Sequence, residues 1–474
     1  MKRKFPKREA RRSLMRAARI DFLAKACGAE IKGDGSYPVR NVKIDSRDCT
    51  DGDLFVCVVG EINNGHRYAR SAYDQGCRAF LTSEDIDVPE DAHILRVTDT
   101  NEAVRDMAAA YLAQFDVKKL AVTGSVGKTS TKMLTAAVMS AKYNTLCTQK
   151  NLNTHLGMCL TCFLADETTQ CIVFEMGMDK PGEISSYVSW VKPELAIITN
   201  VGISHLERLG SRDAIADAKL EITEQFGDSN ILVVNAKSDY LKTEEEIRAR
   251  SRSKAAYKIV RVGEDIDYTD FKSNGTDGIG FKINGVDFSL PLLGEHNALD
   301  ATLAVAAGLE YGISLEDASA ALAGVVATDR RLKAEEIGGI LLLDDSYNAS
   351  PDSMKAGLSA LAALPAKRHI AVLGDMLELG GAEESGHMEV GRYAAEHGVD
   401  IFITTGAHKD YYFRGISEAE NCSMSTLSFN DLDSLKDMVL QVIKPGDAVL
   451  VKGSNSTKFG TVAELIRDSE RKDG

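Results

Sequence analysis

The chain has 474 residues, which is too long for one hydrophobic core and predicts about three domains. Apolar residues make up 44% of the chain and charged residues 27%, as is usual for soluble globular proteins, and the formal net charge of -14 argues against a nucleic-acid binder. The nine cysteines lack the spacing of a disulfide framework, which favours the reducing cytoplasm. No segment approaches the roughly 20 apolar residues that a membrane helix needs. We therefore expect a cytoplasmic multidomain protein with no integral membrane segment.

Residues 1–19 form a basic extension. The first 20 residues hold nine Lys or Arg and one acid. Arg16 and Arg19 interrupt the only candidate for the apolar core of a signal peptide. A solvated, partly helical extension is the simpler interpretation, and contact with anionic lipid or an acidic partner is the alternative.

Residues 20–100 mix short strands and helices and predict a small N-terminal α/β domain, and an amphipathic helix at 101–115 follows as a connector. Strands and helices then alternate strictly, which predicts a parallel sheet covered by helices in a central domain at 101–328. The expected strands are 120–123, 171–175, 195–199 and 231–234, and the expected helices are 129–142, 182–191 and 212–226.

A strand-rich stretch at 257–292 predicts a flanking antiparallel sheet, with Asn284-Gly285 as a two-residue hairpin turn. Helices are expected at 297–311 and 315–324. A second alternating series begins at Ile340 and predicts a doubly wound, Rossmann-like C-terminal domain at 329–474. Its expected strands are 340–344, 369–373, 400–404 and 448–451, and its expected helices are 351–363, 384–397, 431–442 and 459–471.

The segment from Leu120 to Thr129 is an apolar strand followed by a glycine loop, Gly124-Ser125-Val126-Gly127, that ends in Lys128 and Thr129. A helix follows directly, so the amides of Ser125 to Lys128 would face a bound anion at a helix N-terminus. Lys128 supplies a positive charge, and the Thr129 hydroxyl is placed to hold Mg2+. The strict P-loop pattern would put its first glycine where Val122 stands. The segment nevertheless predicts a nucleotide-phosphate site.

Polar residues lie just past the ends of the following strands, where open α/β sheets bind ligands. Glu175 ends one strand, and we favour it as a ligand of the same metal ion over a solvated acid. His205 follows the next strand and could be a ligand or a structural residue. By spacing alone, Lys219 is a surface lysine on a helix. Cys159 and Cys162 form a C-x-x-C pair in an apolar helical run, where buried thiols are more plausible than a redox or zinc site.

No signature of a protein nucleophile is present, so substrate groups would attack phosphorus or acyl carbon directly. From residue 20 onward, the chain resembles a known family, the Mur ligases of peptidoglycan synthesis. The stretch Thr123 to Ser130 resembles the family's shortened phosphate loop. The other segments that carry the resemblance begin at Asn151, Glu175, Asn200, Gly294, Asp344 and Val451. Within the family, the segments Asp344 to Ser353 and Leu373 to Gly380, with His387 downstream, resemble the branch that adds D-alanyl-D-alanine.

The resemblance implies a role for each matching position. Lys128 and the loop from Gly124 to Ser130 would hold ATP, with Thr129 and Glu175 on one Mg2+. His205 would hold a second Mg2+ together with Lys219, which matches a family lysine that is carbamylated. Asn297 would contact adenine, and Arg330 or Arg331, with Asp345, would reach ribose and phosphate from the C-terminal domain. The implied substrate-binding residues are Ser46, Arg47, Asn64, Gly65, His66, Asn151, Asn348 and Ser350.

The implied reaction joins D-alanyl-D-alanine to UDP-N-acetylmuramoyl-tripeptide in two steps, through an acyl phosphate and then amide formation. The enzyme is expected to be a monomer. Two alternatives stay open: a sister ligase that uses another amine substrate, and a nucleotide-binding scaffold with reduced catalysis. Asn455 motivates the second, because the family usually has Arg after Lys452-Gly-Ser454; Lys458 is a candidate to supply that charge.

Overall fold

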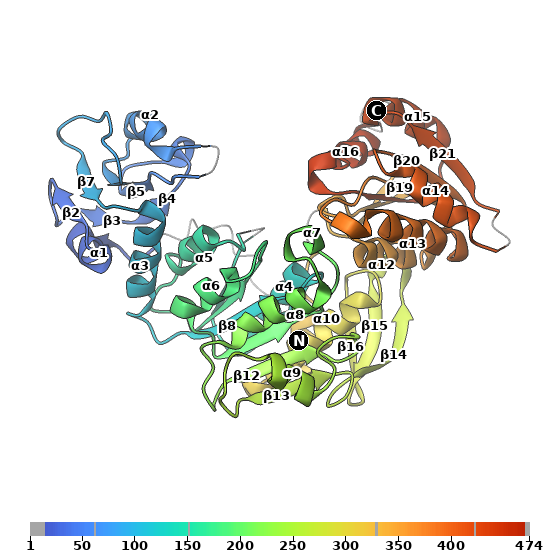
Figure 1. Ribbon diagram of the computed structural model, residues 1–474, viewed down its shortest axis with the longest axis horizontal. Helices are drawn as coiled ribbons and strands as arrows, with labels where there is room; N and C mark the ends of the chain where they lie inside the picture. Colours follow the sequence, from blue (N-terminus) through green and yellow to red (C-terminus); the bar gives the residue numbers. More distant parts are fainter. Residues whose placement is uncertain (1–14, 61–62, 150–151, 328–329, 421–422, 470–474) are drawn as a thin grey trace, which may run out of the picture. The chain divides into compact units, whose positions relative to one another are not determined.

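The computed structural model describes residues 15–60, 63–149, 152–327, 330–420 and 423–469 (Figure 1). Most of the basic extension, residues 1–14, lies outside these ranges. The chain folds as two compact units: the first takes residues up to 120, 143–176 and 190–192, and the second takes 121–142, 177–189 and everything from 193 onward. Among the described residues, no helix has both the length and the apolar character to cross a membrane.

The first unit begins with a small α/β layer. Its five-stranded sheet has the order β2-β7-β6-β5-β4, in which the last four strands are parallel and β2 is antiparallel to β7. A separate pair, β1 with β3, is antiparallel. The bounds are β1 Ala18–Arg19, α1 Ile20–Cys27, β2 Glu30–Lys32, β3 Pro38–Val39, β4 Asn41–Lys43, β5 Asp53–Val56, α2 Ala69–Asp74, β6 Ala79–Thr82 and β7 His93–Arg96.

Helix α3, Thr100–Leu112, is the predicted connector, and it packs against α5, His155–Cys162, through its buried face. Tyr111 on α3 donates a hydrogen bond to the carbonyl oxygen of Ala165 at 2.8 Å. The parallel strands β9, Thr145–Cys147, and β10, Cys171–Glu175, also belong to this unit. The cysteines of the C-x-x-C pair, Cys159 and Cys162, are both buried in α5, where burial raises the pKa of each thiol.

Strand β8, Lys118–Thr123, starts in the first unit and ends in the second. In the second unit the strand order continues from β8 to β11, β12 and β13. The last three of these strands pair in parallel. Helix α10 is buried almost all round, and its Gly308 lies so close to α4 that a Cβ would stand 2.4 Å from Val138. The bounds are α4 Lys128–Met139, α6 Glu183–Val191, β11 Leu195–Ile198, α7 Leu206–Leu209, α8 Arg212–Leu220, β12 Ile231–Asn235, α9 Glu244–Arg250, β13 Lys258–Val262, α10 His296–Glu310 and α11 Leu315–Leu322.

The flanking antiparallel sheet has the order β14-β15-β16, with bounds Tyr268–Ser273, Ile279–Ile283 and Val286–Leu290. The predicted hairpin is confirmed: Asn284 and Gly285 join β15 to β16 and both have positive φ, 48° and 83°, as a type I′ turn requires. One expectation was wrong, because residues 258–262 do not join the antiparallel sheet. They form β13, which pairs in parallel with β12.

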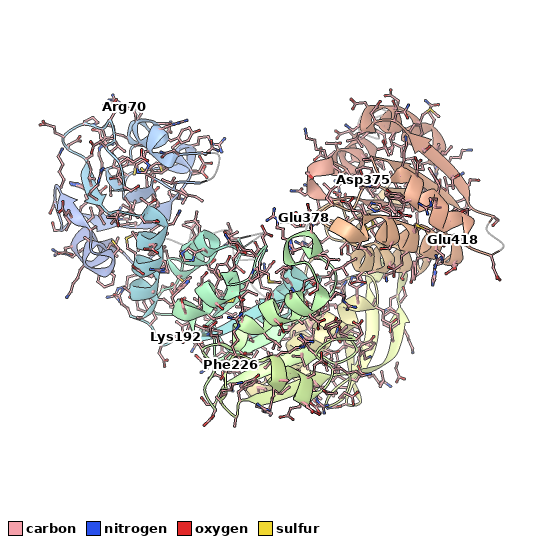
Figure 2. The ribbon with its side chains drawn as sticks, viewed as in Figure 1. Arg70, Lys192, Phe226, Asp375, Glu378 and Glu418 are labelled. Atoms are coloured by element: carbon pink, nitrogen blue, oxygen red, sulfur yellow. The ribbon has the colours of Figure 1, made fainter. Side chains whose placement is uncertain are left out.

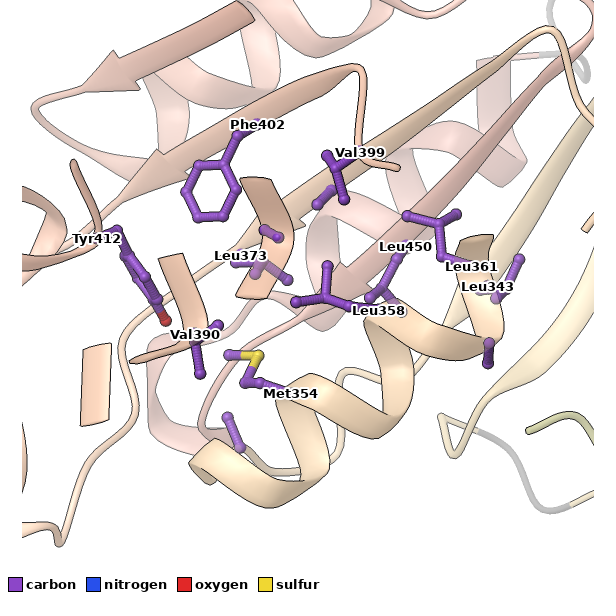
Figure 3. Close-up of a cluster of buried hydrophobic side chains, with 14 of the residues drawn as sticks. Leu343, Met354, Leu358, Leu361, Leu373, Val390, Val399, Phe402, Tyr412 and Leu450 are labelled. Carbon is purple, nitrogen blue, oxygen red and sulfur yellow. The ribbon is translucent and has the colours of Figure 1, made fainter. Parts of the chain in front are cut away.

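The C-terminal sheet has the order β17-β18-β22-β19-β20-β21, parallel except for the edge strand β17. One apolar core packs α12, α13 and α14 on one face, and a second packs α15 and α16 on the other (Figures 1 and 3). The bounds are β17 Lys333–Ile337, β18 Ile340–Asp344, α12 Pro351–Ala362, β19 Arg368–Leu373, α13 Glu383–Glu396, β20 Ile401–Thr405, α14 Lys409–Ser417, β21 Ser425–Phe429, α15 Leu432–Val442, β22 Asp447–Lys452 and α16 Gly460–Ser469. The predicted α/β class, with a Rossmann-like C-terminal sheet, is confirmed.

Candidate functional site

The glycine loop leads from β8 directly into α4, and Gly127 is the N-cap residue of that helix. Gly124 and Gly127 have φ values of 151° and 83°, in the region that favours glycine. The Lys128 ammonium donates to the carbonyl oxygens of Gly124 at 2.8 Å and Ser125 at 3.2 Å. Thr129 is buried in the first turn of α4, and Ser130 follows it. The loop therefore has the conformation and the cation of an anion site at a helix N-terminus.

Residues after β11 hold the loop in place. Oδ1 of Asn200 accepts the backbone N–H of Ser125 at 3.0 Å and of Val126 at 2.9 Å, and the Thr199 hydroxyl donates to the Val126 carbonyl oxygen. The amides of Ser125 and Val126, which were expected to face a ligand, thus donate to Asn200 in this structure. No local pattern indicates this contact, because Asn200 is about 75 residues away.

A buried acid lies beneath the loop. The Oδ1 atom of Asp300, on α10, is 2.8 Å from the position that a Cβ of Gly127 would take, so no larger residue fits at Gly127. Oδ2 of Asp300 and the hydroxyl of Thr131 are buried without a hydrogen-bond partner among the described residues. Burial raises the pKa of Asp300 to about 8, and the nearby Thr131 hydroxyl opposes this only in part. Asp300 is therefore held mainly as a neutral acid at pH 7.

Lys219 lies on α8 and is 1% exposed, so the surface position suggested by spacing is wrong. Burial, reinforced by the nearby Lys128 ammonium, holds the pKa of Lys219 well below its usual value. No described carboxylate forms an ion pair with it. A signal was present in the sequence, because Lys219 stands four residues after Ile215 and three after Ala216, on the buried stripe of the helix.

Asn297 and His296 stand at the start of α10. The Asn297 amide nitrogen donates to the Leu293 carbonyl oxygen at 2.7 Å, while its Oδ1 is buried with no partner among the described residues. Burial, with the nearby Lys452 charge, lowers the pKa of His296 to about 4, so this ring is neutral. The unpaired Asn297 oxygen is suited to accept a hydrogen bond from an exocyclic amine such as that of adenine.

His205 precedes α7 with a φ of 63°, and its Nδ1 is 3.3 Å from Oδ1 of Asp179 and 3.0 Å from Oε2 of Glu378. The side chain is 21% exposed. His205 could be recognised from its place after a strand, whereas the two acids that flank it become apparent only in the structure.

Glu175 ends β10 in the first unit and is buried. Its Oε1 accepts a hydrogen bond from Asn153 at 3.1 Å, and its backbone N–H donates to the Thr148 hydroxyl at 2.9 Å. Among the described residues, no three His, Cys, Asp or Glu side chains form a ready metal cage. Thr129 and Glu175 each carry side-chain oxygen, the donor type that Mg2+ prefers.

The residues predicted to reach ATP from the C-terminal domain are held near the start of the Asp344 to Ser353 segment. Arg330 donates from Nε to the Ser346 hydroxyl at 3.0 Å, and the Arg331 guanidinium lies 4.1 Å from the Tyr347 ring centre. Asp345 is buried and its Oδ2 lies 2.5 Å from the Lys452 ammonium. Burial raises the pKa of Asp345 although Lys452 opposes the shift.

Two residues of this segment, Asn348 and Ser350, are predicted to bind substrate; the first is exposed and the second is buried. The backbone carbonyl oxygen of Asn348 accepts from the Lys452 ammonium at 2.9 Å. Ser350 precedes α12 and its N–H donates to the Ser353 hydroxyl at 2.9 Å. Asn455 and Lys458, at the departure from the family pattern, are both exposed.

A cavity of about 310 Å3 opens at the carboxyl ends of the C-terminal strands. Asp375, which was not among the predicted site residues, lines this cavity. Its carboxylate oxygens accept the N–H groups of Ala407 at 2.8 Å and His408 at 3.2 Å. The lining residues are Asp375, Thr405, Gly406, Ala407, Asn430, Asp431, Leu432, Thr457 and Phe459. Acidic residues in a cavity at strand ends are suited to a small cationic ligand.

The predicted sugar-nucleotide residues lie in the first unit. Ser46 is buried, and the exposed Arg47 pairs with Asp45 at 2.5 Å, which lowers the pKa of that acid to about 2. Asn64 accepts the backbone N–H of His66 at 3.0 Å.

His66 is tied into the fold by both ring nitrogens. Nδ1 lies 2.6 Å from Oδ1 of Asn64, and Nε2 accepts the N–H of Ser83 at 2.9 Å. Gly65 has no room for a Cβ, which would stand 2.7 Å from the Val58 nitrogen. Asn151 lies outside the described residues.

Three family models match the chain in order. They are the Mur ligase family catalytic domain at 38–122, the Mur ligase middle domain at 122–308 and the Mur ligase glutamate ligase domain at 330–455.

Curated relatives match over nearly the whole length. The UDP-N-acetylmuramoyl-tripeptide–D-alanyl-D-alanine ligase of Bacillus subtilis is 33% identical over 91% of this chain and 93% of its own. The ligase of the same name from Escherichia coli is 34% identical over 95% and 98%. A crystal structure of MurF from Acinetobacter baumannii is 28% identical, has a TM-score of 0.86 and covers 95% of this chain and 99% of that one. The chain belongs to the Mur ligase family.

Proposed function

We propose that the chain joins D-alanyl-D-alanine to UDP-N-acetylmuramoyl-tripeptide with ATP, as a monomeric cytoplasmic enzyme of peptidoglycan precursor synthesis. The observation that carries the proposal is the phosphate loop with buried Lys219 and the free Asn297 acceptor, in a chain that matches ligases of that name over nine tenths of its length. The domain limits expected above, 20–100, 101–328 and 329–474, would then separate the binding of sugar nucleotide, ATP and dipeptide.

In the first step the terminal carboxylate of the tripeptide attacks the γ-phosphorus of ATP, which gives an acyl phosphate and ADP. Lys128 and the loop from Gly124 to Ser130 would hold the phosphates, and Asn297 would accept from the adenine amine. Arg330 or Arg331, together with Asp345, would reach the ribose and phosphates. Their cations matter because two anionic groups repel each other as the attack begins.

Magnesium would neutralise charge on the phosphates in this step. Thr129 and Glu175 would hold one ion, and His205 with carbamylated Lys219 a second. The low pKa of Lys219 supports carbamylation, because only a neutral amine attacks CO2, losing a proton as the N–C bond forms. The product is an anion, and the Mg2+ ion that it would hold would compensate for its burial.

In the second step the amine of the dipeptide attacks the acyl carbon and phosphate leaves. We place the dipeptide in the cavity lined by Asp375, with Asn348 and Ser350 as further contacts; Lys458 lies between two lining residues and could take the place of the family's Arg. Ser46, Arg47, Asn64, Gly65, His66 and Asn151 would serve the sugar nucleotide.

The test is phosphate release from ATP and Mg2+ with UDP-N-acetylmuramoyl-tripeptide and D-alanyl-D-alanine, each omitted in turn. Phosphate release is expected only when both substrates are present. Release that continues when one of them is omitted would overturn the ligase assignment. Replacing the dipeptide by D-alanyl-D-serine or D-alanyl-D-lactate separates this ligase from a sister that uses another substrate. No turnover with any of them, despite ADP binding, would identify a nucleotide-binding scaffold.

A further inference from the structure

The His205 ring is flanked by acids from two different parts of the second unit. Asp179 lies between β10 and α6, and Glu378 lies in the segment after β19 of the C-terminal sheet. Their carboxylate oxygens are 3.3 Å and 3.0 Å from the same ring nitrogen, Nδ1. Nδ1 is buried and lies within ion-pair distance of both carboxylates.

The backbone of Glu378 takes an uncommon conformation to reach this place. Its φ is 67°, a region that costs a residue with a Cβ about 1 kcal/mol or more. The two residues before it are fixed, because the N–H of Met376 donates to Nε2 of His387 at 3.0 Å and the N–H of Leu377 donates to the Ser454 hydroxyl at 2.9 Å. A strained residue that is held by its surroundings is typical of functional sites. Figure 2 labels Glu378 and Asp375, which lie in the same segment after β19.

The approach of Glu378 to His205 is also supported by backbone packing. Gly380, with a φ of 53°, lies so close to α7 that a Cβ would stand 2.8 Å from the Cα of Glu207. On the other side, Arg208 holds Asp179 through a contact of 2.8 Å to Oδ2. Both acids are thus placed by other groups and do not reach His205 as freely moving side chains.

We propose that Glu378, with Asp179, is a positioning residue that holds His205 by Nδ1 and leaves Nε2 as the nitrogen available to a metal ion. Ligating histidines usually donate their other N–H to a carboxylate, which fixes the tautomer and the ring orientation. Because Glu378 lies in the segment that follows β19 of the C-terminal sheet, the orientation of His205 depends on the position of that segment. This inference rests on the proposed function, and it gives Glu378 a task that the reaction had not assigned to it.

The first measurement needs no metal. The protein is labelled with 15N-histidine, the His205 signals are assigned with His205→Gln, and the ring nitrogen shifts report the tautomer. Wild type is expected to carry the proton on Nδ1. Glu378→Gln keeps an acceptor and should preserve this tautomer, whereas Glu378→Ala combined with Asp179→Ala should shift the population towards Nε2–H. All three residues at position 378 have a Cβ, so the backbone strain is matched.

The second measurement is Mn2+ binding in the presence of ADP, followed by electron paramagnetic resonance. Glu378→Ala is expected to weaken binding by about 10-fold or more and Glu378→Gln by less. Glu207→Gln is the matched control: it removes one exposed negative charge two residues from His205 and should bind Mn2+ as wild type does. Circular dichroism melting checks that each variant is folded.

Unchanged Mn2+ affinity and unchanged His205 signals in folded Glu378→Ala would overturn the inference. A loss in Glu207→Gln equal to that in Glu378→Ala would also overturn it, because net charge would then explain the effect. These outcomes are separate from a failure of the proposed function, which is read from the wild-type protein in the substrate-omission assay.

Discussion

The two parallel sheets of the second unit end in loops of similar form and opposite charge. After β8, the chain passes Gly124 and Gly127 and reaches Lys128 at a helix N-terminus. After β19, it passes Gly374 and reaches Asp375, whose carboxylate faces the cavity at the strand ends. One architecture thus offers a cation at one sheet and an anion at the other.

The glycines of the two loops serve different needs. Gly127 has positive φ and stands over a neutral acid, so a phosphate can approach the backbone without a nearby negative charge. Gly374 instead makes room for the Phe459 ring, which would lie 2.4 Å from a Cβ. The fold thus supplies a ligand-binding region at the carboxyl ends of the strands in each sheet. A few side chains decide that one region suits a nucleotide and the other an amine.

The largest effect is expected where the cation of the first loop is removed. Lys128→Met keeps the length of the side chain but loses the charge that stabilises the transferred phosphoryl group. We expect kcat to fall by about 10^2- to 10^3-fold, or about 3 to 4 kcal/mol, with weaker ADP binding by calorimetry. Lys142→Met, beyond the far end of α4, is the control and should leave both unchanged. Wild-type turnover in Lys128→Met would show that the cation of the first loop does not serve catalysis.

The neutral acid under the first loop predicts a pH dependence of stability. Asp300 has a pKa of about 8 in the folded protein and about 4 when unfolded, so between these values the folded state holds a proton that the unfolded state releases. This group therefore lowers stability as pH rises from about 4 to 8, by up to about 1.4 kcal/mol per pH unit. Asp300→Asn removes this contribution.

Urea unfolding at pH 6, 7 and 8 measures the effect. The stability of Asp300→Asn relative to wild type should increase with pH, and parallel curves would contradict a neutral Asp300. Glu316→Gln, an exposed change on the neighbouring helix α11, should run parallel to wild type.

The smallest effect is expected at the second loop. Asp375→Asn loses the charge that would attract the dipeptide ammonium group but can still accept an N–H. We expect the KM for D-alanyl-D-alanine to rise about 10-fold, or about 1.4 kcal/mol, while ADP affinity stays the same. An equal change in ADP affinity would show that the two loops are not specialised as the comparison states. Asp433→Asn, exposed on α15, is the matched control.

The sequence allowed the buried strands to be predicted well because each is a short apolar run. The expected strand 171–175 is β10 with the same bounds, and 340–344 is β18. The edge strands were missed because they lack such runs. β17, Lys333–Ile337, alternates charges with apolar residues, and β21, Ser425–Phe429, is mostly polar and partly exposed.

The candidate site divides in the same way. The phosphate loop is local in sequence, so its form could be predicted from Gly124 to Thr129. The contacts of Asn200, Asp300 and Glu378 come from distant segments, and no local pattern specifies which of them will meet. Lys219 shows the intermediate case, since its place on the apolar stripe of α8 indicates burial but its chemistry depends on residues elsewhere.

The sharing of β8 between the two units limits how the enzyme can be dissected. Residues 143–176 belong to the first unit although they lie in the chain between stretches of the second. A fragment that starts at residue 121 would keep α5 and lose α3, the helix that covers it. Its apolar face, with Met158, Cys159 and Cys162, would then meet water and favour aggregation. A nucleotide-binding fragment intended for expression should therefore begin before Thr100, so that α3 is retained.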